Sequence, residues 1–175
     1  FDYRKNIYNS IKAFGQSLID YKDDEIMKDL EYRILCTHSH KNRVLFDRLL
    51  SEYNLSNRVK LLDFVSEEEL IKLYKNCSLF FFPSLYEGFG LPVLEAMLSG
   101  NYILASNRSS LPEICGNYAL YCNPESIADM SEKIHLALNN RKNEEISKIE
   151  ARQQYAQSFT WEKTSMKTLD FLKLN

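Results

Sequence analysis

Glycine is scarce in this chain, and its uneven placement is the first informative feature of the sequence. Only five of the 175 residues are glycine, which is about 3% where ~7% is typical. Three of the five, Gly88, Gly90 and Gly100, fall within thirteen residues. Because the chain uses so little glycine elsewhere, we expect it to be needed there for backbone conformations that other residues rarely adopt.

An excess of charge of either sign is also missing. The chain has 22 lysine and arginine residues against 24 aspartate and glutamate residues, a formal net charge of −2. General nucleic-acid binding would need a clear basic excess, so we expect no nucleic-acid partner. The composition, 45% hydrophobic and 26% charged, excludes a disordered or low-complexity chain. The length indicates a single domain over residues 1–175.

Long apolar runs and closely paired cysteines are absent as well. The longest apolar run covers residues 78–82, far short of the roughly 18 to 20 residues that span a bilayer. Charged and apolar residues alternate from the start, so no secretory signal is expected. The cysteines are too far apart for a CxxC metal pair, which predicts free thiols in a reducing compartment, the cytoplasm by default. They are Cys36, Cys77, Cys115 and Cys122.

The pattern of apolar residues alternates between strand-length and helix-length segments. The expected strands are Tyr32–Cys36, Arg58–Leu62, Leu79–Phe82, Tyr102–Ala105 and Ala119–Cys122, and the expected helices are Asn6–Ile19, Arg43–Tyr53, one opening at the capping box of Ser66 and Glu69, Leu91–Leu98, one starting at Leu111, Ile127–Leu138, Glu144–Gln157 and Trp161–Leu174. This alternation predicts an α/β domain with a doubly wound, Rossmann-like, mostly parallel sheet, in which Leu79–Phe82 is a central strand buried on both faces.

Ligands of such sheets bind outside the carboxyl ends of the strands, which directs attention to residues 83–97. Here a glycine-containing turn follows the apolar strand, and a helix opens at about Leu91. The free N–H groups and partial positive charge of a helix start suit a phosphate, and glycine lets the backbone approach it. Glu95 lies about one turn into the helix, where its carboxylate could accept two hydrogen bonds from a vicinal diol such as ribose. Glu87 would face the other end of the same ligand.

The same spacing also has an ordinary structural explanation. A glycine pair before a helix is a common tight turn, and motif matches of this length carry false positives. Glu87 and Glu95 would then be two solvated carboxylates, favoured near a helix start by its dipole. Generic spacing leaves both interpretations open.

The full string around Glu87-Gly88-Phe89-Gly90-Leu91-Pro92 and Glu95 resembles the signature of the retaining GT-B glycosyltransferases of family four, also called glycosyl transferases group 1. The similarity extends along the chain in the right order. It includes Arg4-Lys5-Asn6 with the helix after it, VKLLDFVSEEELIKLY from Val59 to Tyr74, LPEICGNYAL from Leu111 to Leu120, and Phe159-Thr160-Trp161-Glu162. Asp63, the loop Thr37–His40 and Tyr102 depart from the family pattern, which has glycine, a glycine-bearing loop and proline near these places.

The resemblance implies that this chain is the C-terminal, donor-binding domain of a two-domain GT-B fold. The family's first strand and a phosphate-contacting arginine normally lie just before the position of Phe1. The N-terminal domain binds the acceptor, so the isolated domain is expected to be inactive. The implied partners are a UDP-, GDP- or ADP-sugar donor and a glycan or lipid acceptor, in polysaccharide or glycoconjugate biosynthesis; no cofactor is implied, and peripheral contact of the full-length enzyme with a membrane stays open.

The resemblance also assigns roles to individual residues. Glu87 is the catalytic residue, holding sugar hydroxyls near the anomeric carbon, and Glu95 holds the ribose. The other donor-binding positions are Lys5 at the phosphates, Val65 in the base-contacting turn, and Gly88, Phe89, Gly90 and Leu91 around the helix start. A different class of function is a catalytically inactive nucleotide-binding or interaction module of the same fold, which would show no sugar transfer.

Four further polar residues are candidates for a functional role. His38 and His40 stand two apart in a polar loop, but two ligands without a nearby carboxylate or thiolate make a poor metal site, so no metal is expected. Arg108 follows a strand end and is either a diphosphate ligand or a solvated loop cation. His135 lies inside a helix, where a surface or partly packed role is expected.

Overall fold

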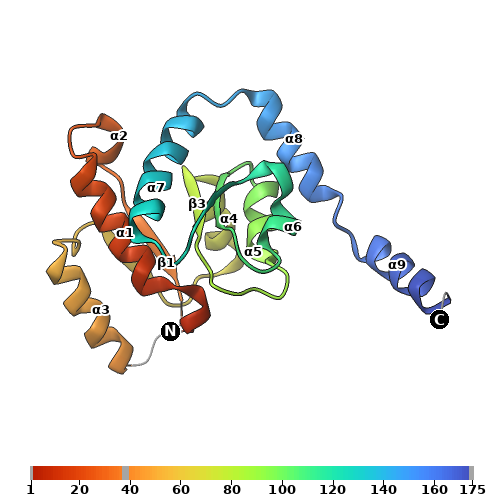
Figure 1. The fold of residues 1–175 in the computed structure, drawn as a ribbon, viewed down its shortest axis with the longest axis horizontal. Helices are drawn as coiled ribbons and strands as arrows, with labels where there is room; N and C mark the ends of the chain where they lie inside the picture. Colours follow the sequence, from red (N-terminus) through yellow and green to blue (C-terminus); the bar gives the residue numbers. More distant parts are fainter. Residues whose placement is uncertain (1, 37–39, 174–175) are drawn as a thin grey trace.

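The computed structural model describes residues 2–36 and 40–173 and has an α/β architecture (Figure 1). The helices are α1 (Ile7–Asp20), α2 (Glu25–Lys28), α3 (His40–Glu52), α4 (Glu67–Lys75), α5 (Leu91–Leu98), α6 (Leu111–Cys115), α7 (Ile127–Lys142), α8 (Ile146–Gln157) and α9 (Trp161–Lys173), and the strands are β1 (Tyr32–Leu35), β2 (Val59–Leu62), β3 (Leu79–Phe82), β4 (Tyr102–Ser106) and β5 (Leu120–Cys122). The expected α/β class is confirmed, and most boundaries lie within one or two residues of the expected ones.

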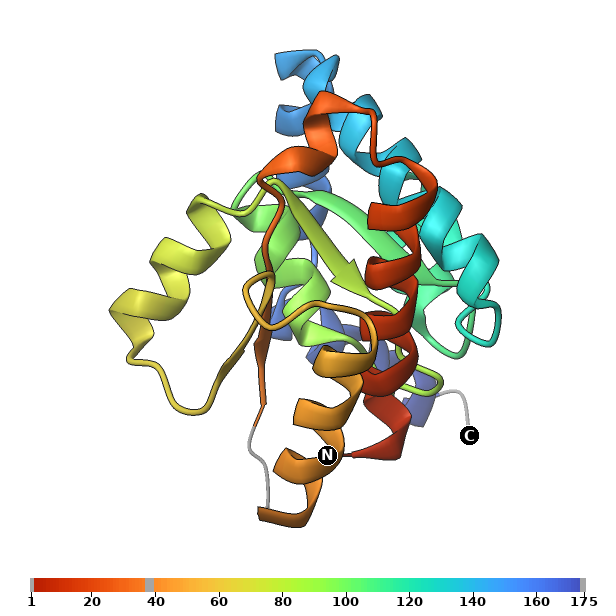
Figure 2. The same ribbon diagram turned by 90° about the vertical axis from the view of Figure 1, so that its left-hand side faces the viewer.

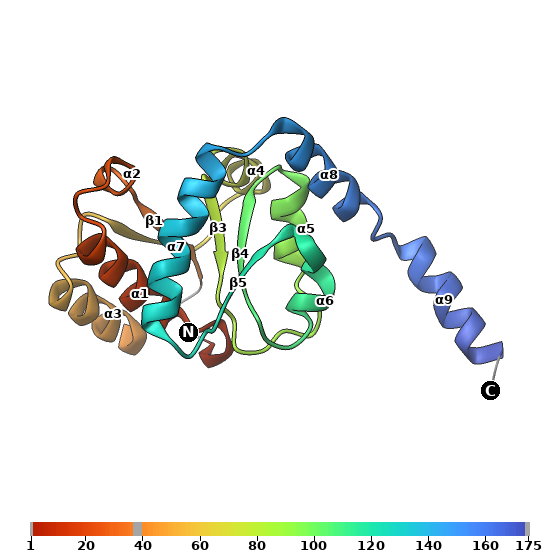
Figure 3. The ribbon, with the colours of Figure 1, turned by 45° about the horizontal axis from the view of Figure 1, so that its top comes forward.

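All paired strands run parallel, but they form two sheets. One sheet has the order β3-β4-β5 and the other consists of β1 and β2. Helices cover both faces of β3-β4-β5, with α1 and α7 on one side and α5 and α6 on the other (Figure 3). The β3-β4-β5 sheet, with helices on both of its faces, therefore matches the expected doubly wound topology.

The expectation that Leu79–Phe82 is a fully buried central strand is wrong for the described residues. Among them, β3 pairs with β4 on one side only, and all four of its residues are half-buried. The reason is a cavity of about 870 Å³ that is lined by every residue of both β1 and β3. The apolar edge of β3 therefore faces an open space in place of another hydrogen-bonded strand.

Two hydrophobic clusters form the core. One gathers α1, α3 and α7 around residues such as Ile11, Phe46 and Met130, and the other gathers α5 and α6 around residues such as Met97 and Leu111. The amphipathic spacing seen in the sequence explains both, because the apolar stripe of each helix is the side that is buried. The four cysteines are free.

The α4 helix begins at the expected capping box. The Ser66 hydroxyl accepts a hydrogen bond from the Glu69 N–H, and the Glu69 carboxylate accepts one from the Ser66 N–H. The apolar residues Leu70, Leu73 and Tyr74 of this helix are only half-buried, and none of the described residues of α4 is fully buried. Figure 2 shows why, since α4 (yellow) stands away from the rest of the fold at the left.

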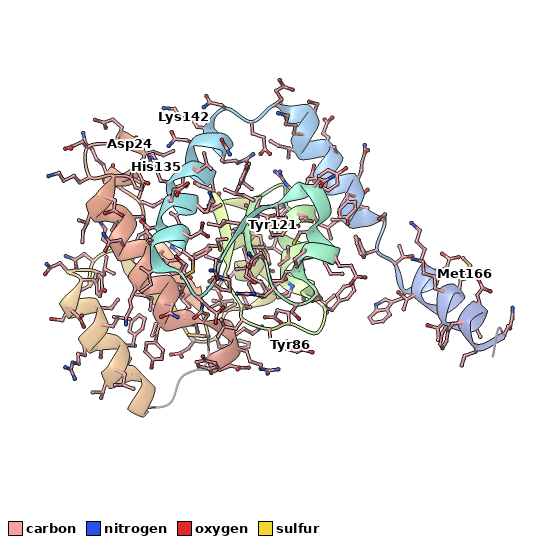
Figure 4. All side chains as sticks on the ribbon, in the orientation of Figure 1. Asp24, Tyr86, Tyr121, His135, Lys142 and Met166 are labelled. Carbon is pink, nitrogen blue, oxygen red and sulfur yellow. The ribbon has the colours of Figure 1, made fainter. Side chains whose placement is uncertain are left out.

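The final helix, α9, projects away from the body of the fold (Figure 1). Its apolar side chains are solvent-exposed, including Trp161 at 83%, and Met166 points outward from it (Figure 4). The described residues contain no helix long and apolar enough to cross a membrane.

His135 is partly buried, as expected, and joins α7 to the short helix α2. Its Nε2 lies 2.7 Å from Asp24 Oδ2, and its ring stacks on Tyr21 at 3.8 Å between centroids. Figure 4 shows Asp24 and His135 next to each other at this end of the molecule. The contact fastens α2, a helix that the sequence pattern did not predict.

Candidate functional site

The loop that follows β3 is fastened by polar contacts from distant parts of the chain. The buried side chain of Asn6 donates to the carbonyl oxygens of Pro83 and Pro124 at 3.1 and 2.7 Å. The Ser106 hydroxyl at the end of β4 donates to the Ser84 carbonyl at 2.6 Å. The first residues of the chain are therefore tied to the carboxyl end of β3, and Lys5 is brought to the loop by its neighbour Asn6.

Two serines hold the next part of the loop. Ser109 and Ser110 both donate to the Glu87 carbonyl, at 2.6 and 3.0 Å, and Ser110 also lies 3.0 Å from the Phe89 carbonyl. Ser109 has a positive φ of 56°, a conformation that is uncommon outside glycine. The Glu87 N–H in turn lies 3.3 Å from the Ser109 hydroxyl, so both serines hold the backbone of the turn at Glu87.

The start of α5 has the features that an anion site needs. Gly90 caps the helix with φ of 106°, and a Cβ there would meet Leu111 Cδ2 at 2.9 Å, so both conformation and packing require glycine. A Cβ at Gly88 would meet nothing within 4 Å, which leaves open space beside the turn. No described residue accepts a hydrogen bond from the N–H of Gly88, Phe89 or Gly90. These donors are therefore available to a ligand.

Lys5 and Glu87 form an ion pair across this turn. Lys5 Nζ donates to Glu87 Oε1 at 2.7 Å although the residues are 82 positions apart in the sequence. The ammonium also lies 5.2 Å from the centre of the Phe82 ring. The Lys5 side chain is 41% exposed and that of Glu87 13%, so the lysine is accessible to a ligand from solution.

Glu95 extends from α5 and has a different partner. The Tyr74 hydroxyl on α4 donates to Glu95 Oε2 at 2.9 Å. Burial, and then the hydrogen bond and charge of Glu95, raise the pKa of Tyr74 well above its ordinary value. Tyr74 is therefore a permanent donor near neutral pH, and within the described part of the chain no other group donates a hydrogen bond to the Glu95 carboxylate.

The structure brings some of the expected site residues together and leaves one apart. Lys5 and Glu95 line the same cavity, together with Tyr74 and Pro92. Glu87 joins this group through Lys5, and residues 88–91 form the turn between the two glutamates. Val65 lies between β2 and α4, half-buried; it does not line the cavity, as Glu87 and residues 88–91 also do not, and among the described residues it has no hydrogen bond to the other site residues that would join it to them. Its neighbour Phe64 is 91% exposed.

The remaining polar candidates have other partners or are not described. Arg108 pairs with Glu125 at 2.6 Å, with both side chains exposed, as a solvated loop cation would. His38 lies outside the described residues, and so does the side chain of His40. Within the described part of the chain, no group of three or more potential metal ligands lies together.

Several residues that shape this site were not identified from the sequence as site residues. They are Asn6, Tyr74, Ser106, Ser109 and Ser110. Each acts by a hydrogen bond to a residue far away in the sequence, and single polar residues of this kind carry no local pattern. Ser109 and Ser110 offered the only hint, because polar residues after a strand end meet the neighbouring strand's loop in a parallel sheet.

Comparison with known proteins gives consistent results at the level of sequence. The sequence profile of the family described as "Glycosyl transferases group 1" matches residues 1–154. The "Serotype-specific mannosyltransferase WbdA" of Escherichia coli is 40% identical over 124 residues, which are 70% of this chain and 15% of that protein. The "O-antigen chain mannosyltransferase B" of Escherichia coli is 37% identical over 116 residues, 66% of this chain and 30% of that protein. The chain thus spans less than a third of these relatives.

Solved structures share the fold. The sucrose-phosphate synthase of Thermosynechococcus elongatus matches with a TM-score of 0.79 at 22% identity, over 99% of this chain and 43% of that one. HepE of Anabaena, solved in complex with UDP, matches with a TM-score of 0.78 at 18% identity, over 99% of this chain and 46% of that one. The motif order, the site geometry and the match over residues 1–154 lead to one conclusion: this chain belongs to the glycosyl transferases group 1 family.

Proposed function

We propose that this chain is the nucleotide-sugar-binding domain, the C-terminal half of a GT-B fold, of a retaining glycosyltransferase. The observation that carries the proposal is that Lys5, which is paired with Glu87, lines the same cavity beside β3 as Glu95. Lys5 and Glu95 line one cavity, and Lys5 contacts Glu87 at 2.7 Å. A chain that only needed to fold would have no requirement for two acidic side chains and a lysine around a turn with unused N–H donors.

In this proposal each group contacts one part of the donor. Negative charge develops on the leaving diphosphate as the bond to the sugar breaks, and positioned donors stabilise it most in a site that they preorganise. Lys5 and the N–H groups of the turn from Gly88 to Leu91 take that role. Glu95 accepts the ribose hydroxyls, and Glu87 holds sugar hydroxyls near the anomeric carbon. Val65 contacts the base from the turn before α4.

The names of the relatives suggest the sugar and the pathway. Both Escherichia coli relatives are mannosyltransferases, and one of them acts on the O-antigen chain. We therefore propose mannose as the first sugar to test, in the assembly of a polysaccharide. The acceptor, a glycan or lipid, would be held by a second domain of the protein. The donor is a UDP-, GDP- or ADP-sugar, and no cofactor is assigned.

The test is a titration of the 175-residue chain with UDP, GDP and ADP and with UDP- and GDP-sugars, followed by ligand-observed NMR and by thermal shift. We expect saturable, weak binding of one nucleoside diphosphate, and no sugar transfer by this chain alone, because half of the reactant positioning is lost without the acceptor domain. No saturable binding to any of these nucleotides would contradict the proposed function. Binding without transfer by the full-length protein would instead support the inactive binding module.

A further inference from the structure

Tyr74 connects the outlying helix α4 to the carboxylate that is proposed to hold ribose. Its hydroxyl donates to Glu95 Oε2 at 2.9 Å, and its ring lies 5.7 Å from the Phe80 ring of β3, tilted by 46°. The structure shows a polar contact between two helices at the cavity wall.

The surroundings of α4 make this contact important. None of the described residues of α4 is fully buried, and the helix stands away from the rest of the fold (Figure 2). The ring of Tyr74 reaches the cavity wall at Phe80, and its hydroxyl reaches α5. Tyr74 therefore holds α4 against the cavity and fixes one oxygen of Glu95 at the same time.

Glu95 has little else to orient it. It is an exposed side chain on a helix surface, and a glutamate in that position samples several rotamers that binding would have to restrict. An ionised carboxylate has about four acceptor positions on its two oxygens. The hydrogen bond from Tyr74 restricts the position of Oε2 and leaves Oε1 for the two hydroxyls of a vicinal diol.

We infer that Tyr74 is a positioning residue for ribose recognition, which preorganises the Glu95 carboxylate before the nucleotide arrives. This inference rests on the proposed function, since it concerns the same site. Preorganisation raises affinity by reducing the freedom that is lost on binding. The α4 helix also follows the turn that contains Val65, so the contact links the proposed base-binding turn to the ribose-binding side chain.

The experiment uses Tyr74→Phe, which keeps the ring and its packing on Phe80 and removes only the hydroxyl. The probes are whichever of UDP, GDP and ADP binds the wild-type chain best, and the 2′,3′-dideoxy form of that same nucleotide. We expect Tyr74→Phe to weaken the ribonucleotide by about three- to tenfold, the effect of having to order one freely rotating side chain on binding. Its effect on the dideoxynucleotide should stay below about 1.5-fold, because no ribose hydroxyl is there to be oriented.

A matched control is Tyr121→Phe. Tyr121 also donates its hydroxyl to a close acceptor, the Gly116 carbonyl at 2.6 Å, and lies 3.4 Å from the Pro112 carbonyl, but it is on β5 (Figure 4) and does not line the cavity. Tyr121→Phe should change neither the affinity for the ribonucleotide nor the affinity for the dideoxynucleotide. Thermal unfolding of both variants shows whether either substitution disturbs the fold.

The outcomes separate this inference from the function on which it rests. An equal loss of both nucleotides in Tyr74→Phe would give Tyr74 a structural role and overturn the inference, as would no loss in either. If the wild-type chain binds ribo- and dideoxynucleotide equally well, the assignment of Glu95 to ribose fails and the inference fails with it, while nucleotide binding stands. If the wild-type chain binds no nucleotide at all, the proposed function itself is wrong.

Discussion

Two ion pairs in this molecule have the same length and opposite surroundings. Arg152 Nη1 and Glu144 Oε1 are 2.7 Å apart, and their side chains are 4% and 5% exposed. Lys5 Nζ and Glu87 Oε1 are also 2.7 Å apart, but their side chains are 41% and 13% exposed. The distances alone would suggest the same role for both pairs. The exposed fractions of the side chains show that the first pair is buried and that the second is open to water.

The Arg152 pair is part of the structure. The guanidinium donates to both oxygens of Glu144 and to the Gly100 carbonyl just beyond α5, and Arg141 donates to the same carboxylate. These contacts fasten α8 to the end of α5 and to the connection after α7. Because the buried charges have exchanged water for each other, neither can lose its partner without a large penalty.

The Lys5 pair is suited to exchange. Water reaches the lysine, so its bond to Glu87 contributes little net stability, and a diphosphate offers the ammonium a more highly charged partner. The same 2.7 Å contact can therefore be given up when a ligand binds. The comparison predicts that breaking the Arg152 pair destabilises the fold strongly and that breaking the Lys5 pair does not.

The largest effect is expected at the buried pair. Arg152→Met keeps much of the side-chain volume, removes the charge and leaves the Glu144 carboxylate with Arg141 alone. The free energy of unfolding should fall by about 3 to 5 kcal/mol, the usual cost of breaking a buried pair, as measured by urea denaturation. Arg43→Met is the control, because Arg43 pairs with Asp47 on an exposed surface and should cost less than about 1 kcal/mol. If both variants lost the same free energy of unfolding, burial would not explain the different roles of the ion pairs.

A smaller effect, on binding, is expected at Glu95. Glu95→Ala should weaken nucleoside diphosphate binding by roughly 1 to 3 kcal/mol, since hydrogen bonds to a charged group are lost. Calorimetric titration of the chain measures this loss. The free energy of unfolding should change by less than about half a kcal/mol, because Glu95 is exposed. Unchanged nucleotide affinity would remove Glu95 from the site.

A further effect is a pH dependence of the buried pair. Burial by itself raises the pKa of Glu144, but the hydrogen bonds and charges of Arg152 and Arg141 outweigh burial and hold the pKa below its ordinary value of 4.5. A carboxyl with a depressed pKa in the folded protein contributes stability above the unfolded-state value, and that contribution is lost as the pH falls through the folded-state value. Stability should therefore drop below about pH 4.5, as measured by urea midpoints across a pH series.

Glu144→Gln provides the comparison for this pH series, because glutamine does not titrate. Its urea midpoint should be lower than that of the wild type at neutral pH and should fall less steeply on acidification. Parallel curves for the two proteins would show that acid sensitivity comes from other carboxyl groups.

The smallest effect on the isolated chain is expected at Glu87. Glu87→Ala should change the free energy of unfolding by less than about 1 kcal/mol and leave nucleoside diphosphate affinity nearly unchanged, because the proposed function places Glu87 at the sugar and Lys5 at the phosphates. Sugar transfer by the full-length protein should be lost, as measured by product formation from its donor. A loss of nucleotide affinity equal to that of Glu95→Ala would contradict the separate roles of the two glutamates.

Local patterns were sufficient for most of the secondary structure. Strand Leu79–Phe82 and helix Leu91–Leu98 have the bounds that the sequence predicted, because an apolar run and a glycine-proline helix start leave few alternatives. The capping box at Ser66 fixed the start of α4 in the same way. The helix α2 was missed, since it has a single buried residue, Met27, and no periodic stripe to predict it.

In the candidate site, too, the residues of one local motif could be predicted, and the contacts between distant residues could not. Glu87, Glu95 and the turn between them could be found from the sequence because they are neighbours within one motif. The partners of the two glutamates could not be assigned in that way. Lys5 reaches Glu87 across 82 positions and Tyr74 reaches Glu95 across 21, and only the packing of α4 and of the first turn against the end of β3 brings them together.

The sequence by itself determined that this protein is an α/β chain with a glycine turn, an acidic residue on each side of it and a lysine at the start, because composition, periodicity and motif spacing are local properties. Only the tertiary structure decided that β3 lines an open cavity, that α4 is fastened through Tyr74, and that two ion pairs of equal length differ in burial. These are properties of distances between residues far apart in the chain, and they depend on how the whole fold excludes or admits water.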